Sequence, residues 1–157
     1  MNGATMRVRE IMSTEVKTIQ PDEPAWLALE KMRSEGIHHL VVMDGRSVVG
    51  VASTRDLAEG RTGEAWKGLR VSELMAHAPV CVKPDLPVKR AANLLRGRSI
   101  GCLPVVDGGK LVGIVTVSDL LDLVGHGLTS RRPAGSERTT RHRAAPPIAR
   151  HAATRLS

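Results

Sequence analysis

Residues 113–119 of the chain read GIVTVSD, and residues 50–56 read GVASTRD. Both stretches fit one template: a glycine, an apolar residue, any residue, a serine or threonine, any two residues and an aspartate. Each is the end of an apolar strand pattern that runs into a hydroxyl and a carboxylate. The recurrence of this pattern 63 residues apart predicts an internal duplication.

The duplication extends well beyond these two stretches. Residues 7–57 align with residues 70–120 at a constant offset of 63 without a gap, and 18 of the 51 aligned positions are identical. Because the identical positions run along the whole alignment, both copies are expected to have the same fold.

The first half of each copy is predicted to be a short strand followed by a helix. The strands are residues 16–19 and 80–82, and apolar residues then recur at 25, 28, 29 and 32 and at 88, 91, 92 and 95, which is the spacing of one helix face. These helices are predicted to have aspartate N-caps, prolines in the first turn and glycines near the end, at Asp22 and Asp85, Pro24 and Pro87, and Gly36 and Gly97.

The second half of each copy is predicted to be a hairpin followed by a helix. LVVM at 40–43 and LPVV at 103–106 are apolar strands, and the turn sequences DGR and DGGK lead into the returning strands SVVGVAS and KLVGIVT. The final helices are expected to start near Thr54 and Val117.

These elements predict an α+β protein of two tandem β-α-β-β-α repeats. A copy of about 55 residues is too small to bury a good core alone, so the two are expected to pack together about a pseudo-twofold axis. The duplicated strand ends would then meet across a shared groove and form two equivalent clefts. The predicted organisation is repeat 1 at 7–60, a linker at 61–69, repeat 2 at 70–127 and a tail at 128–157.

Composition narrows the class of protein. No run of 18 apolar residues is present, so we expect no membrane contact, and the N-terminal residues lack the apolar core of a secretory signal, so we expect a cytoplasmic protein. The two cysteines, Cys81 and Cys102, are expected to be free thiols. Phenylalanine and tyrosine are absent, which disfavours a stacking platform for nucleic-acid bases.

The repeats resemble the CBS domain pair, also called a Bateman module. The resemblance covers residues 7–124 and rests on stretches such as GIHHLVVMDGRSVVGVASTRDL and SIGCLPVVDGGKLVGIVTVSDL. It implies a regulatory module that is not an enzyme, requires no cofactor and binds AMP, ADP, ATP or a related adenosyl ligand such as S-adenosylmethionine, with Mg²⁺ carried in by ATP. It also implies a homodimer that regulates another protein.

The duplicated motif suits such a ligand. An ionised Asp56 or Asp119 accepts hydrogen bonds only and can bind a ribose diol. Ser53 and Thr116 lie where a strand meets a helix start, which favours a phosphate. The same residue pairs are also N-terminal capping patterns, because a cap and a nucleotide site use similar atoms. Both interpretations stay open from the sequence.

The resemblance further implies that each ligand site draws on both repeats. The first site would comprise Val51, Ser53, Arg55, Asp56, Val82, Ile100, Gly101 and Cys102. The second would comprise Thr18, Ile37, His38, His39, Ile114, Thr116, Ser118 and Asp119. Arg55 matches phosphate geometry, and its counterpart in the second site is Ser118, where the two histidines would supply donors.

No catalytic or metal site is predicted. Neighbouring strand residues point to opposite faces, so His38 and His39 cannot chelate one ion together. Two other functions remain as alternatives: a ligand-free dimerisation scaffold, and binding of a polyanion such as nucleic acid through the tail. Residues 129–157 hold seven arginines and one glutamate, and we expect this tail to be disordered.

Overall fold

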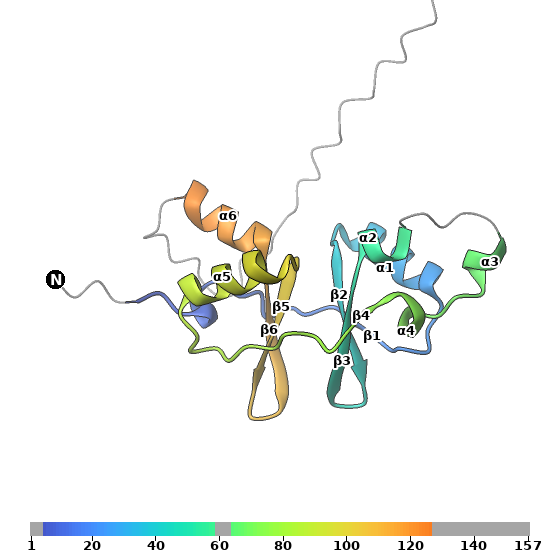
Figure 1. Ribbon diagram of the computed structural model, residues 1–157, viewed down its shortest axis with the longest axis horizontal. Coiled ribbons are helices and arrows are strands. Elements are labelled where there is room, and N and C mark those ends of the chain that lie inside the picture. Colours follow the sequence, from blue (N-terminus) through green and yellow to red (C-terminus); the bar gives the residue numbers. More distant parts are fainter. Residues whose placement is uncertain (1–4, 59–63, 127–157) are drawn as a thin grey trace, which may run out of the picture.

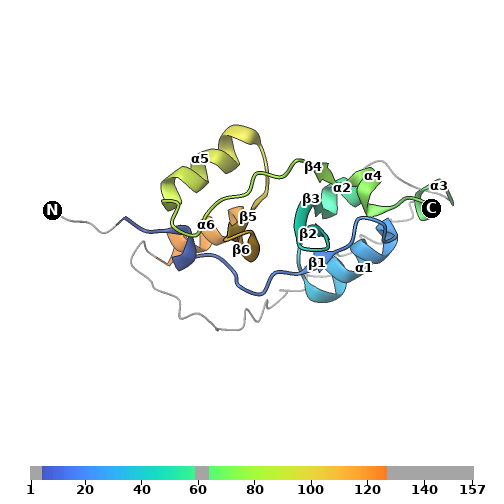
Figure 2. The same cartoon turned by 90° about the horizontal axis from the view of Figure 1, so that it is seen from below.

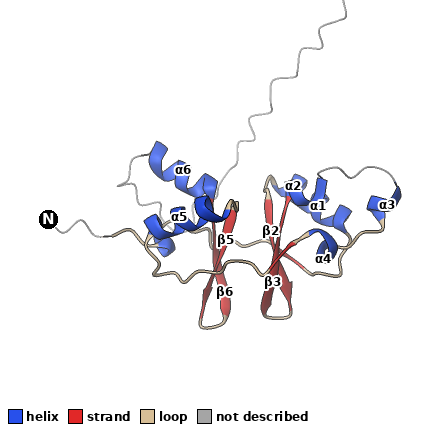
Figure 3. Cartoon of the chain, in the orientation of Figure 1, coloured by secondary structure: helices blue, strands red, loops and turns tan. Residues whose placement is uncertain are grey.

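The computed structural model describes residues 5–58 and 64–126 of the chain. Two hairpins stand side by side at the centre of the molecule, and the helices lie on the two outer flanks (Figures 1 and 3). This arrangement confirms the predicted α+β fold of two like repeats. Residues 59–63, which include the start of the predicted linker, and residues 127–157, which include the whole predicted tail, lie outside the described residues.

The half of the molecule built on the first repeat contains a mixed sheet with the strand order β1-β2-β3-β4, and β4 comes from the start of the second repeat. Its strands are β1 (Thr18–Ile19), β2 (His39–Asp44), β3 (Ser47–Ser53) and β4 (Ala76–His77). β1 pairs with β2 in parallel, and β3 pairs with both β2 and β4 in antiparallel fashion. The helices of this half are α1 (Ala25–Glu35), α2 (Thr54–Ala58), α3 (Glu64–Lys67) and α4 (Val71–Leu74).

The second repeat contributes an antiparallel hairpin of β5 (Cys102–Asp107) and β6 (Lys110–Thr116). Its helices are α5 (Val88–Arg98) and α6 (Val117–Gly125), and the 3₁₀ helix η1 (Val8–Glu10) lies near the start of the chain. Both hairpins have the predicted turns, in which Gly45 and Gly108 take the positive φ angles of 59° and 57° that favour glycine. The final helices start at Thr54 and Val117, as predicted.

The predicted aspartate N-caps are wrong, whereas the glycine predicted near the end of α1, Gly36, is its C-cap. The N-caps of α1 and α5 are Pro24 and Pro87, which have extended ψ angles of 140° and 137°, rather than the aspartates two residues earlier. A proline suits this place because its lost N–H would have no partner inside the helix. α5 also continues past Gly97 to Arg98. Its C-cap is Ser99, which adopts the left-handed conformation that Gly36 has after α1.

The strand predicted at residues 80–82 is reduced to a single parallel bridge between Val82 and Val105. The segment nevertheless lies along β5, since the Val82 N–H donates to the Pro104 carbonyl at 2.9 Å and the Val82 carbonyl accepts from the Val106 N–H at 2.8 Å. Proline at position 104 has no N–H to add a further rung, because its ring occupies that nitrogen.

The leading segment of each repeat packs on the other repeat. The N–H of Val8 donates to the Leu86 carbonyl at 2.8 Å, and the N–H of Val71, 63 residues later, donates to the Glu23 carbonyl at 2.9 Å. Ser13 bridges to β6 just as β4 pairs with β3. Figure 2 shows the two segments crossing between the halves on opposite sides of the molecule. The sequence repeats are therefore not the packing units.

Two duplicated glycines make this exchange possible. A Cβ at Gly50 would lie 2.5 Å from the Met75 sulfur and 2.9 Å from the Ala76 carbonyl oxygen. A Cβ at Gly113 would lie 2.6 Å from the Met12 sulfur and 3.0 Å from the Ser13 carbonyl oxygen. Both glycines are buried, and the close approach they allow is to the exchanged segment of the chain.

Each half has its own apolar core, and a third cluster joins the halves. Leu40, Leu57 and Val71 are fully buried in the first core, and Val8, Leu103 and Val115 in the second. The third, here called the inter-repeat cluster, contains buried Val41, Cys102 and Ile114 with partly buried Val16, Met43, Val48, Val51 and Leu111. Among the described residues, no helix is long and apolar enough to cross a membrane.

Candidate functional site

The first strand-to-helix junction is the turn from β3 into α2. Here the Asp56 N–H donates to the Ser53 hydroxyl oxygen at 3.0 Å, and the Ser53 N–H donates to Oδ2 of Asp56 at 3.1 Å. This reciprocal pair is a capping box. Within the described residues Oδ1 of Asp56 makes no hydrogen bond, and the side chain is half-buried, so it can accept a further bond.

The second strand-to-helix junction is the turn from β6 into α6, and it is tighter. The Thr116 N–H donates to Oδ2 of Asp119 at 2.7 Å, and the Thr116 hydroxyl donates to the same oxygen at 3.0 Å. The Asp119 N–H in turn donates to the Thr116 hydroxyl oxygen at 3.3 Å. Asp119 is 3% exposed, and it is the buried charged residue of the described chain. The capping interpretation of the motif is thus realised at both junctions.

The first junction faces the second repeat across a single glycine. His39 pairs with Ser53 across the β2–β3 ladder, so the two side chains lie on the same face of the sheet. A Cβ added to Gly101 would collide with Nε2 of His39, so the ring lies directly against the Gly101 backbone. His39 was assigned to the second site from the sequence, but its ring contacts a residue assigned to the first.

Asp56 acts electrostatically on both repeats at this place. Burial lowers the pKa of His39, nearby His38 lowers it further, and the Asp56 carboxylate opposes the change. Burial raises the pKa of the Cys102 thiol to about 12, and Asp56 raises it as well. The first junction therefore gathers a carboxylate, a neutral imidazole and a protonated thiol, with Ser53 and Gly101 between them.

The remaining residues predicted for the first site are divided between the surface and the cores. Val51 lies in the inter-repeat cluster, and Arg55 is exposed at the start of α2. Val82 differs from the prediction, because its side chain is 7% exposed and packs in the core of the second repeat. The Ile100 side chain packs against that same core.

The second set of predicted residues is more dispersed. Ile114 lies in the inter-repeat cluster, and Ile37 packs against the core of the first repeat. His38 and Ser118 are exposed. Thr18 is half-buried in β1, and its carbonyl accepts from the Lys31 ammonium at 2.8 Å. Of this set, Thr116 is hydrogen-bonded to Asp119.

The residue next to Val82 occupies the equivalent position of Thr18 in the other repeat. Cys81 is the counterpart of Thr18 at the offset of 63 residues, yet Val82 was chosen instead. Cys81 is exposed, whereas Val82 is in the core. The repeat alignment itself carried this signal, because Val82 aligns with Ile19, which is also buried.

The described part of the chain holds no group of three or more histidine, cysteine, aspartate or glutamate side chains that could bind a metal ion. His38 is exposed while His39 turns towards Gly101, so the neighbouring histidines do point apart.

The two sequence repeats match a known family. The sequence profile of the CBS domain matches residues 8–62 and 71–126. This chain belongs to the CBS domain family. The two matched ranges make it a tandem CBS pair, as the resemblance in the sequence implied.

Known relatives include both small proteins and enzymes. A CBS domain-containing protein of Dictyostelium discoideum is 36% identical over 131 residues, which cover 74% of this chain and 90% of that relative. Inosine-5'-monophosphate dehydrogenase of Korarchaeum cryptofilum is 30% identical over 136 residues, which cover 86% of this chain but 28% of that enzyme. The match therefore covers only a part of that enzyme.

A solved structure shows what one related pair binds. The CBS domain pair of protein MJ0100, in complex with 5'-methylthioadenosine and S-adenosyl-L-methionine, superposes with a TM-score of 0.69 at 26% identity. The match covers 77% of this chain and 97% of that one. Adenosine-containing ligands therefore bind within the family on this same fold.

Proposed function

We propose that this CBS pair is a non-catalytic regulatory module that binds an adenosine-containing ligand at the first strand-to-helix junction. The observation that carries the proposal is the set of polar groups gathered around Asp56, where His39 of the same repeat lies against Gly101 and the Cys102 thiol comes from the other repeat. The related pair of protein MJ0100 binds 5'-methylthioadenosine and S-adenosyl-L-methionine, which supports the ligand class.

Asp56 is the proposed acceptor for the ribose diol. Its Oδ2 is held by the Ser53 N–H, which orients the carboxylate, and its Oδ1 has no partner within the described residues. A hydrogen bond from a ribose hydroxyl to an ionised carboxylate contributes about 1.5–3 kcal/mol. The cap and the ligand site are therefore compatible in one side chain.

The neighbours of Asp56 are suited to the rest of such a ligand. Neutral His39 can donate or accept through its ring nitrogens, and Arg55 offers a guanidinium for a phosphate or carboxylate group. The Gly101 backbone and the Val51 side chain provide the apolar wall for a purine. Since His39 lies against Gly101, we expect its ring to move when a base enters between the repeats.

The second junction is proposed to be mainly structural. Asp119 is 3% exposed and is held by Thr116 through both its N–H and its hydroxyl. A ribose would have to displace these bonds to reach the carboxylate. We therefore expect one ligand per chain rather than two.

We propose that the bound state is passed on through contact with a second copy of the chain. Trp26 on α1 is 46% exposed, and Leu121 and Val124 on α6 are 64% and 69% exposed. Large exposed apolar side chains on outer helices favour self-association. A ligand can then act only by binding one arrangement of the two copies more tightly than another.

Thermal unfolding tests this function directly. The protein is unfolded with AMP, ADP, ATP (with and without Mg²⁺), S-adenosylmethionine or 5'-methylthioadenosine. A ligand at 100 times its dissociation constant should stabilise the native state by about 2.7 kcal/mol. The Asp56→Asn variant should weaken binding at least about tenfold, because the amide keeps the cap but loses the charge.

The matched control is Asp44→Asn, an exposed aspartate at the turn of the first hairpin. It removes the same charge away from the junction and should bind the ligand as the wild type does. If no member of the panel stabilises the protein, the ligand-binding proposal is wrong and the ligand-free scaffold is favoured. Polyanion binding by the tail concerns residues outside the described ranges and stays a prediction.

A further inference from the structure

A hollow opens at the end of the molecule opposite the two junctions, between the turns of the two hairpins. Its volume is about 570 Å³, which is within the usual range for small-ligand pockets. Thr14, Val16 and Thr18 line it from the segment before and in β1, and Arg46 and Lys110 line it from the two turns. None of the residues assigned to the first site lines this hollow.

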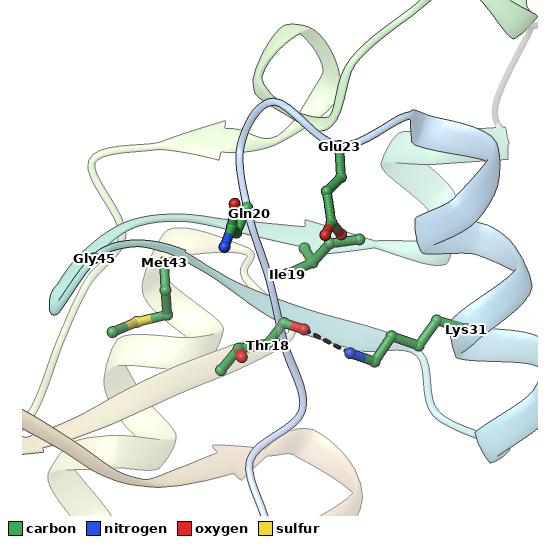
Figure 4. Close-up of a pocket in the computed structure, with 7 residues that line it drawn as sticks. All are labelled: Thr18, Ile19, Gln20, Glu23, Lys31, Met43 and Gly45. Carbon is green, nitrogen blue, oxygen red and sulfur yellow. Dashed lines mark hydrogen bonds between the residues drawn. The ribbon is translucent and has the colours of Figure 1, made fainter.

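The floor of the hollow is apolar. Val16, Met43 and Leu111 line it, and all three belong to the rim of the inter-repeat cluster. A smaller hollow of about 330 Å³ adjoins it and shares Thr18 and Met43. In Figure 4 the Thr18 and Met43 side chains lie on one side of the segment, while Lys31 reaches the Thr18 carbonyl from the other.

The wall of the larger hollow is cationic. Arg46 and Lys110 line it, no aspartate or glutamate does, and neither cation makes a side-chain hydrogen bond or ion pair within the described residues. Asp44 and Asp107 stand at the ends of the preceding strands, exposed and outside the lining. Two unpaired cations above an apolar floor favour an anion that carries an apolar body.

The repeats differ at these two cations. At the offset of 63 residues, Arg46 aligns with Gly109, and Lys110 aligns with Ser47. The two cations are therefore not copies of one another, yet both line one hollow on one side of the pseudo-twofold axis. Because neither position carries a cation in the other repeat, the duplication alone does not account for the two positive charges at this hollow.

We propose that this hollow is a second ligand site, for a small phosphorylated molecule with an apolar body. Arg46 and Lys110 bind the phosphate, Thr14 and Thr18 hydroxyls add hydrogen bonds, and Val16, Met43 and Leu111 contact the body. The site lacks a carboxylate for a ribose diol and so differs from the proposed adenosine site. It stands whether or not the adenosine proposal holds.

The probe for this site is 1-naphthyl phosphate, which combines a phosphate with an apolar ring. Its binding is measured by its own fluorescence, and 1-naphthol and inorganic phosphate serve as the two halves of the probe. The intact compound should saturate at one per chain and bind more tightly than either half. The affinity should fall with added salt, because both cations are exposed.

The double variant Arg46→Gln/Lys110→Gln should weaken binding about tenfold or more, since it removes both charge-assisted bonds. The matched control is Lys89→Gln/Arg90→Gln, which removes the same charge from exposed positions on α5 and should leave the affinity unchanged. The amide NMR signals of Thr14, Val16 and Leu111 should shift on titration.

The proposal is wrong if there is no saturable binding, if the Arg46/Lys110 variant binds with equal affinity, or if both double variants lose affinity equally, which would indicate net charge alone. Asp56→Asn should leave the affinity for 1-naphthyl phosphate intact. If Asp56→Asn abolishes it instead, the probe occupies the first junction, and this proposal fails while the adenosine site survives.

Discussion

The two strand-to-helix junctions start from one sequence template and end in different surroundings. Around Asp56 the structure places a half-buried histidine, a thiol and the backbone of the other repeat. Around Asp119 it places a three-bond cap and almost no exposed surface. The duplicated motifs are alike in sequence, but His39 lies against Gly101 at the first junction, whereas the second junction is closed by the buried Asp119.

The two halves stay alike where the leading segment of each repeat packs on the other repeat. Gly50 and Gly113 contact these segments, and their substitution should give the largest effects on stability. Gly50→Ala should destabilise the protein by about 2–3 kcal/mol, because its Cβ would meet both a sulfur and a backbone carbonyl. Gly113→Ala should cost nearly as much. The control is Gly97→Ala in α5, where nothing lies within 4 Å and alanine is the better helix former.

Urea unfolding of the three variants measures these differences. A loss of stability in Gly50→Ala without a similar loss in Gly113→Ala would show that the two leading segments do not pack equivalently. A loss of stability in Gly97→Ala would mean that the cost at the other two sites is not a matter of close packing.

Replacement of Asp56 and Asp119 by alanine should destabilise the protein by different amounts. Asp119→Ala should cost about 2 kcal/mol, because it leaves a buried N–H and hydroxyl without their acceptor. Asp56→Ala should cost about 1 kcal/mol, as expected for the loss of a partly exposed cap. Chemical denaturation without ligand measures both, and equal costs would contradict a buried, structural second junction.

Lowering the pH should reduce the free energy of unfolding more through the first junction than through the second. The pKa of His39 is lowered in the folded state, so the unfolded chain binds more protons as the pH falls below about 6.5. The free energy of unfolding should therefore be highest above that pH and decrease towards the lowered folded pKa. His39→Gln should flatten this dependence by a fraction of a kcal/mol.

The control for the acid effect is His77→Gln, since His77 is exposed in β4. Its stability should follow the wild-type pH dependence. A His77 variant that flattens the curve as much as the His39 variant would remove the first junction as the cause.

The smallest effect concerns the thiols. Burial and Asp56 raise the pKa of Cys102 to about 12, while Cys81 is exposed and its pKa is raised less strongly, by burial alone. A disulfide reagent at pH 8 should modify one thiol per native chain quickly and the other only on unfolding. Fast reaction of both thiols would show that the first junction opens readily.

Much of the fold followed from the repeat alone. Identical positions such as Gly45 and Gly108 specified the hairpin turns, and the apolar spacing specified the long helices. The exchange of leading segments was not visible, because no local pattern tells whether Val8 and Val71 pack on their own repeat or on the other. The same long-range contact accounts for the close packing against Gly50 and Gly113, which the duplicated template alone does not reveal.

The site was predicted less completely than the fold. The motif identified Ser53, Asp56, Thr116 and Asp119, since their spacing is a property of one turn of chain. Burial of Asp119 and the contact of His39 with Gly101 depend on the packing of two sheets, which the spacing does not encode. Val82 is buried while its neighbour Cys81 is exposed, since one residue along an extended segment reverses the side chain.

The most direct test of the account is isothermal titration of the tightest adenosine ligand into the wild type, Asp56→Asn and Asp119→Asn. We predict one ligand per wild-type chain, a loss of at least about tenfold in affinity for Asp56→Asn, and unchanged affinity for Asp119→Asn. Two ligands per chain, or a loss confined to Asp119→Asn, would contradict the account.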